Sequence, residues 1–239
     1  MWWKTYKRPE DHPKLSKEEL EYINSDSVTE SIEKIPWKKV FPKRQTWAFS
    51  LAKVTDAVWW FYLFWGAIFL AEKFGVKIKE MGLPFLVIYL IADAGSIFGG
   101  WLSGAFIKKG WSINKARKLT LLICALVILP VAFVAVTDNK WLAIFLIGLG
   151  AAGHQAWSAN IFTLASDVFP KKATASVVGI GGMVGAVAGI ISNFILGSVL
   201  DNAGNSGFFW AFLVAGSLYI VLLGLVHFCL LYTSPSPRD

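Results

Sequence analysis

The sequence has little charge, and this scarcity excludes an ordinary soluble domain. Only 16% of its 239 residues are Asp, Glu, Lys or Arg, whereas 55% are hydrophobic and 15% are aromatic. Such a composition is typical of a protein that crosses the membrane several times. The net charge of +7 does not indicate nucleic-acid binding, because the sequence lacks a solvated basic domain with aromatic residues. Most basic residues flank apolar segments instead, where they set membrane orientation.

Cysteine is also scarce, and the usual marks of a catalytic or metal site are missing. Cys124 and Cys229 form no motif, so they predict neither a disulfide framework nor a metal site. No spacing of nucleophile and base, or of metal ligands, supports an enzyme. The glycine-rich segment 179–189 lacks the Lys-Ser/Thr ending and the preceding strand of a phosphate-binding loop. We therefore expect no enzyme activity, no cofactor and no metal.

The two ends of the chain differ in composition from its centre. Residues 1–45 are polar and mixed in charge, and the capping box that starts at Ser16 predicts a short surface helix. This segment lacks the apolar centre and cleavage site of a signal peptide, so we expect a cytoplasmic linker. Residues 229–239 resemble the translation of a sequencing-library adapter. We expect this tail not to belong to the natural protein and a six-helix bundle to occupy residues 46–228.

Six apolar segments lie between these ends, and each is long enough to cross a bilayer as a helix. Lys and Arg are concentrated before the first segment, between the second and third, and between the fourth and fifth. By the positive-inside rule these connections are cytoplasmic, in what we expect to be a bacterial inner membrane. The predicted spans are Thr46–Ala71, Leu83–Ile107, Leu119–Val136, Trp141–Ser166, Ala173–Leu200 and Phe208–Phe228.

The six spans are of three kinds, which recur once in the same order. The first and fourth carry aromatic and polar residues, and the third and sixth are nearly all apolar. The second and fifth carry glycines four residues apart, a spacing that lets helices approach closely. An odd number of helices per repeat gives the two triplets opposite orientations, as in secondary transporters. The predicted fold is an all-α membrane protein, a bundle of six transmembrane helices made of two inverted three-helix repeats.

Three ionisable side chains lie at similar depth in three different spans. They are Asp56 in the first, Asp93 in the second and His154 in the fourth. Because such groups are costly in hydrocarbon, they indicate a coupling or gating role at an alternating-access site. Asp93 would equally suit a contact between helices, and His154 a packing position that donates to a nearby carbonyl. Both interpretations remain open for each residue.

The first span carries a charged pair and an aromatic cluster. Lys53 and Asp56 lie three residues apart on one helical face. They either neutralise each other or receive an anionic substrate, and the sequence leaves both interpretations open. Trp59 and Trp60 are expected to form a cavity wall for a sugar ring, with contact to lipid as the alternative.

The polar residues of the fourth span fall into two groups by helical angle. His154, Gln155 and Ser158 share one arc, whereas Asn160 and Thr163 lie on the opposite side. We expect Gln155 and Ser158 to bind substrate hydroxyls. Asn160 is a further candidate for substrate binding, although its angle favours a bond to a neighbouring helix near the cytoplasmic side.

Several motifs together resemble the C-terminal half of bacterial hexuronate transporters, in the anion:cation symporter branch of the major facilitator superfamily. They are LSKEELEYI, the KVTDAVWWFYLFW segment, GGWLSGAFIKKGWSINKARK, GHQAWSANIFTLASDVFP and ASVVGIGGMVGAVAGIISN. The resemblance implies a proton-coupled importer of glucuronate, galacturonate or a related aldonate, whose missing N-terminal six-helix half is the partner of this chain. Tyr62, within the second motif, joins the expected substrate-binding residues. Transport of another organic anion, or a non-transporting membrane fragment or scaffold, are the alternatives.

Overall fold

The computed structural model describes residues 6–25, 35–204 and 206–229, and it divides the chain into two compact units, 1–34 and 35–239. In the first unit, η1 (Pro9–Asp11) precedes α2 (Lys17–Ser25). The backbone N–H of Glu19 donates to the hydroxyl of Ser16 at 3.1 Å, so the helix begins where the capping box predicts. Apart from Cys229, the adapter-like tail lies outside the described residues.

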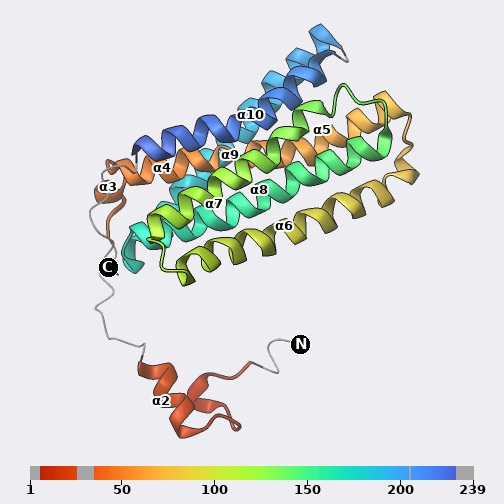
Figure 1. The fold of residues 1–239 in the computed structure, drawn as a ribbon. Coiled ribbons are helices and arrows are strands. Elements are labelled where there is room, and N and C mark those ends of the chain that lie inside the picture. The colour runs from red at the N-terminus through yellow and green to blue at the C-terminus, as the bar shows by residue number, and fades with distance from the viewer. Residues whose placement is uncertain (1–5, 26–34, 205, 230–239) are drawn as a thin grey trace. The chain divides into compact units, whose positions relative to one another are not determined.

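The described part of the second unit contains helices and turns without strands, and six of its helical segments are long and apolar enough to cross a membrane (Figure 1). This confirms the predicted all-α bundle with six spans. A short helix, α3 (Trp37–Val40), precedes the first span. The spans are α4 (Arg44–Lys53) with α5 (Asp56–Phe74), α6 (Gly82–Lys108), α7 (Ile113–Ile128) with η3 (Leu129–Phe133), α8 (Lys140–Val168), α9 (Lys171–Ala203) and α10 (Ser206–Cys229). Between α5 and α6 lies η2 (Ile78–Glu80).

Two spans change their helical geometry part-way. In the third span, α7 ends at Ile128 and the 3₁₀ turn η3 follows, with Pro130 at its start, where a proline cannot continue the regular helical bonds. The first span, predicted as continuous, is broken between Lys53 and Asp56. The hydroxyl of Thr55 donates to the carbonyl of Ala52 at 2.8 Å, and backbone bonds of the shorter i→i−3 type replace regular helical bonds.

Helix α8 is the centre of the bundle. In its most apolar stretch 61% of the residues are buried, against 17% in α6 and 11% in α9. Helix α6 packs along α8 through Gly95 and Gly99 (Figure 1). A Cβ atom at Gly99 would lie 2.5 Å from the Cα of Ala156, so a side chain at this position would separate the helices. The predicted close approach through glycine is confirmed on this face, whereas Gly100 and Gly104 of α6 border open space.

Candidate functional site

The candidate site begins at the break in the first span, where Lys53 ends α4 and Asp56 begins α5. The ammonium of Lys53 lies 2.9 Å from Oδ1 and 2.7 Å from Oδ2 of Asp56. The Lys53 side chain is 8% exposed and that of Asp56 is 27% exposed, so the pair opens outward on the carboxylate side. Discontinuous membrane helices commonly surround the binding sites of transporters, because their exposed ends need polar partners.

Helix α9 borders the site with glycine residues, so no side chain separates it from the first span. At Gly185 an added Cβ would lie 2.9 Å from the carbonyl oxygen of Lys53 and 3.2 Å from Oδ2 of Asp56. One turn earlier, Gly181 contacts the ring of Phe49. The fifth span therefore packs its glycines against the broken first span. This close contact explains the four-residue glycine spacing seen in the sequence.

His154 lies in an aromatic cluster beside this pair. Its side chain is buried, and its Nδ1 lies 2.7 Å from the hydroxyl of Tyr219 on α10. The indole of Trp59 stacks on the imidazole with ring centroids 5.5 Å apart and planes at 18°. The structure thus gives His154 a side-chain hydroxyl as partner, and Trp59 contacts the histidine ring as part of the packed cluster.

Gln155 and Ser158 lie on a partly exposed face of α8 that also contains Phe162. The ring of Phe162 lies 4.4 Å from the Lys53 ammonium, so this face of α8 borders the charged pair. Among the described residues, neither the Gln155 amide nor the Ser158 hydroxyl has a hydrogen-bond partner. Both side chains therefore have unused hydrogen-bonding capacity on this face of α8.

Three further predicted site residues differ in their exposure and contacts. Trp60 is 44% exposed and stacks on Phe64. Asp93 is exposed on α6, without a hydrogen bond or ion pair to the described residues. Tyr62 is fully buried, with its hydroxyl against Gly150 and without a hydrogen-bond partner in the described part of the chain. The Tyr62 side chain therefore has no exposed area in this structure.

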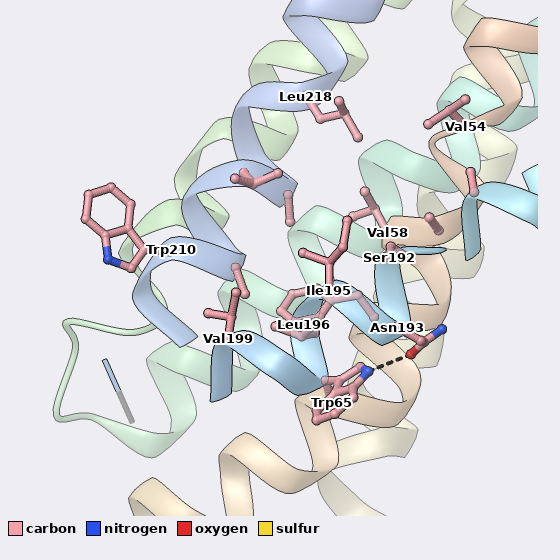
Figure 2. A pocket seen from close by; sticks show the side chains of 16 residues that line it. Val54, Val58, Trp65, Ser192, Asn193, Ile195, Leu196, Val199, Trp210 and Leu218 are labelled. Atoms are coloured by element: carbon pink, nitrogen blue, oxygen red, sulfur yellow. Dashed lines mark hydrogen bonds between the residues drawn. The ribbon is translucent and has the colours of Figure 1, made fainter. Parts of the chain in front are cut away.

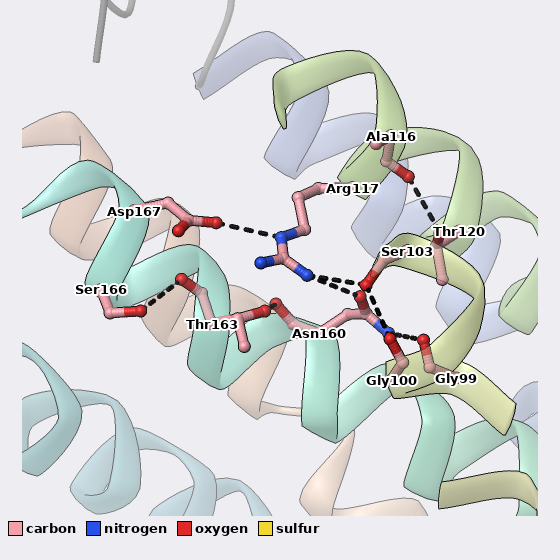
Figure 3. Close-up of polar contacts among 10 residues, drawn as sticks. All are labelled: Gly99, Gly100, Ser103, Ala116, Arg117, Thr120, Asn160, Thr163, Ser166 and Asp167. Atoms are coloured by element: carbon pink, nitrogen blue, oxygen red, sulfur yellow. Dashed lines mark hydrogen bonds and ion pairs between the residues drawn. The ribbon is translucent and has the colours of Figure 1, made fainter. Parts of the chain in front are cut away.

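Asn160 belongs to a second polar cluster, which joins α6, α7 and α8 (Figure 3). Its amide nitrogen donates to the carbonyl of Gly99 at 3.0 Å, the interhelical bond that its helical angle predicts. Arg117 donates from Nε to Asp167 at 3.0 Å and from Nη1 to Ser103 at 2.7 Å and Asn160 at 3.4 Å. Asn160 is therefore engaged in helix packing, as its helical angle predicts.

The Arg117–Asp167 ion pair and the His154–Tyr219 contact are absent from the sequence prediction. The pairs are 50 and 65 residues apart in the chain. Arg117 was counted with the basic residues of a loop, and Tyr219 with an apolar span. For His154 and Tyr219 the local signal is a polar group inside a largely apolar helix, which indicates an unseen partner, whereas Arg117 lies among other basic residues and gives no such signal.

A groove of about 300 Å³ lies between α5, α9 and α10, but it does not fit a sugar acid (Figure 2). Its walls are mostly aliphatic and aromatic, including Val58, Leu196 and Leu218. At one side the indole of Trp65 donates to Asn193 at 2.7 Å, so these polar groups are already paired. A ligand with many hydroxyls would lose hydrogen bonds to water there without replacement.

Comparison with known proteins identifies a family of transporters. Residues 1–193 match the family described as Major Facilitator Superfamily. The chain is 28% identical over 214 residues to the hexuronate transporter of Escherichia coli K12, which covers 87% of this chain and 50% of that protein. It is 28% identical over 215 residues to a probable galactarate/D-glucarate transporter of the same organism, covering 84% of this chain and 48% of that protein.

A further relative and a solved structure agree with this comparison. An uncharacterized transporter of Bacillus subtilis is 30% identical over 238 residues, covering 95% of this chain and 53% of that protein. The fold resembles the inward-facing, unoccupied structure of a bacterial homolog of the human lysosomal transporter Spinster, with a TM-score of 0.52 and 18% identity. That match covers 97% of this chain and 53% of the other. The chain spans about half the length of the relatives it matches.

Proposed function

The chain belongs to the major facilitator superfamily, and we propose that it serves, as one half of a longer carrier, in the symport of sugar acids with protons. It is a multi-pass membrane protein whose family and fold are those of transporters rather than enzymes. Its half-length match to sugar-acid transporters supports a partner of six further helices. The basic connections support a cytoplasmic N-terminal unit in a bacterial inner membrane.

One observation carries the proposal: a buried ammonium contacts Phe162, on the face of α8 that also carries the Gln155 amide and the Ser158 hydroxyl, both unpaired among the described residues. Lys53 supplies the charge that a sugar-acid carboxylate requires. Gln155 and Ser158 supply an amide and a hydroxyl for its hydroxyl groups. Trp59 and Trp60 remain the candidates for contact with the ring. Binding at this site would change the relative stability of the inward-open and outward-open states, which is the basis of alternating access.

Uptake by the complete carrier in proteoliposomes tests this function. With an inward proton gradient, we expect accumulation of radiolabelled glucuronate, competition by galacturonate and galactarate, and no competition by neutral glucose. Collapse of the proton gradient should abolish accumulation. Equal competition by glucose and by sugar acids would reject the substrate class, and accumulation without a proton gradient would reject proton coupling. Two further competitors, the aldonate gluconate and the inorganic anion phosphate, separate sugar acids from other anions.

Substitutions on α8 distinguish substrate contact from helix packing. Gln155→Ala removes an amide that has no partner in the described part of the chain, so we expect the KM for glucuronate to rise about tenfold through loss of a hydrogen bond. Asn160→Ala removes bonds to Gly99 and Arg117, so we expect lower thermal stability with less change in KM. The measurement is uptake at a series of glucuronate concentrations. A larger rise in KM for Asn160→Ala than for Gln155→Ala would reverse the assignment.

A further inference from the structure

The Lys53 ammonium has a single anionic partner and unused capacity to donate. An ammonium can donate three hydrogen bonds, and the described residues offer it only the two oxygens of Asp56. Its other close contact is the face of Phe162, on the α8 surface that presents Gln155 and Ser158. The carboxylate that holds Lys53 is the more exposed member of the pair. A second carboxylate approaching along α8 would therefore compete with Asp56 for the same ammonium.

The charges around the pair favour exchange of partners over addition of another anion. The titratable groups that face it are His154 from α8 and Tyr219 from α10, with Tyr62 of α5 beside Tyr219. Helix α9 contributes glycine, and its sequence between residues 173 and 200 contains no charged residue. The pair is neutral, so a bound anion would add one uncompensated negative charge. In a site removed from water such a charge is costly unless a proton neutralises it.

We propose that the substrate carboxylate replaces Asp56 as the partner of Lys53, and that Asp56 binds one proton in the same step. Before the step, the site holds an ammonium–carboxylate pair, while the sugar-acid anion and the proton are in solution. After it, the ammonium pairs with the sugar acid and Asp56 is a neutral carboxylic acid. The only covalent change is a new O–H bond on Asp56, and substrate release reverses it. This exchange rests on the proposed function and makes Lys53–Asp56 a coupling element with one proton per anion.

The test compares charge-neutralising variants of the complete carrier in proteoliposomes, with glucuronate as the probe. For the native carrier we expect apparent affinity to fall about tenfold per pH unit on the alkaline side, the slope for uptake of one proton. Asp56→Asn should bind glucuronate with the same affinity at every pH. It should also retain glucuronate exchange across the membrane, because Lys53 remains, but lose accumulation driven by a proton gradient. The matched control Asp201→Asn neutralises an exposed aspartate near the end of α9, outside the site, and should keep the native pH dependence.

A second variant and a spectroscopic measurement guard against a folding defect. Lys53→Met with Asp56→Asn keeps the site neutral, so it should fold but lose at least about tenfold in glucuronate affinity, because a charge-assisted bond is missing. Infrared difference spectra of the native carrier should show a new protonated-carboxyl band on glucuronate binding, absent in Asp56→Asn. Accumulation by Asp56→Asn with native pH dependence, loss of that dependence in Asp201→Asn, or absence of the band would overturn the exchange. Each would leave glucuronate uptake by the native carrier, and hence the proposed function, intact.

Discussion

Leucine at Gly99 is expected to destabilise the bundle by at least about 3 kcal/mol, whereas leucine at Gly100, the next residue, should cost less than about 1 kcal/mol. A Cβ atom at Gly99 would lie 2.5 Å from both the Cα and Cβ of Ala156, and a backbone atom of the buried helix α8 cannot rotate away. At Gly100 the added side chain meets open space. The midpoint of thermal unfolding, followed by circular dichroism of the purified chain in detergent, measures the difference.

The adjacent glycines make this a controlled comparison, because composition, depth in the span and helix propensity are the same for both. If the loss of stability came from crowding within α6 rather than from its contact with α8, Gly99→Leu and Gly100→Leu would unfold at similar temperatures. Alanine at Gly99 should give a smaller loss in the same direction, since it adds only the Cβ atom. A native-like unfolding midpoint for Gly99→Leu would mean that α6 does not pack on α8 as described.

Replacing Arg117 with glutamine is expected to lower the free energy of unfolding by about 3 kcal/mol. The side chains of Arg117 and Asp167 are 13% and 10% exposed, so the substitution leaves a nearly buried carboxylate without its cation. It also removes the donor that joins Ser103 to Asn160. Denaturant or thermal unfolding of the purified chain measures the loss.

The control and the rescue for Arg117 follow from its neighbours. Lys115→Gln removes a charge two residues earlier that contacts the ring of Trp111, so it should change stability by less than about 1 kcal/mol. Adding Asp167→Asn to Arg117→Gln removes the orphaned charge and should restore part of the stability. If the double variant is no more stable than Arg117→Gln alone, the ion pair is not the source of the loss.

Sequence predicts the spans well because the requirement for an apolar helix is local: the residues from Gly82 to Lys108 together form one hydrophobic segment, despite the single acidic residue within it. The break after Lys53 depends on a different kind of information. Thr55 has a hydroxyl that bonds the backbone, but threonine occurs in many continuous helices. The carbonyl of Ala52 also accepts from the indole of Trp157, 105 residues later in the chain, and no local pattern encodes that contact.

The candidate site divides in the same way. Lys53 and Asp56 are three residues apart, so helical geometry alone predicts that they meet. The angular separation of Gln155 from Asn160 likewise follows from one helix. By contrast, Tyr62 joined the expected substrate-binding residues through the motif that contains it, and the structure buries it where Gly150 leaves room for its hydroxyl. That outcome depends on which helices become neighbours.

The exposed carboxylate of Asp93 has a consequence for how the protein enters the membrane. An aspartate at the centre of a span costs about 3 kcal/mol on insertion, whereas each Leu, Ile, Phe or Val returns about 0.3 to 0.6 kcal/mol. The apolar residues of α6 on either side of Asp93 are numerous enough to offset that cost. The second span can therefore move from the translocon into the membrane without help from another helix. Insertion of α6 therefore does not require Asp93 to be paired.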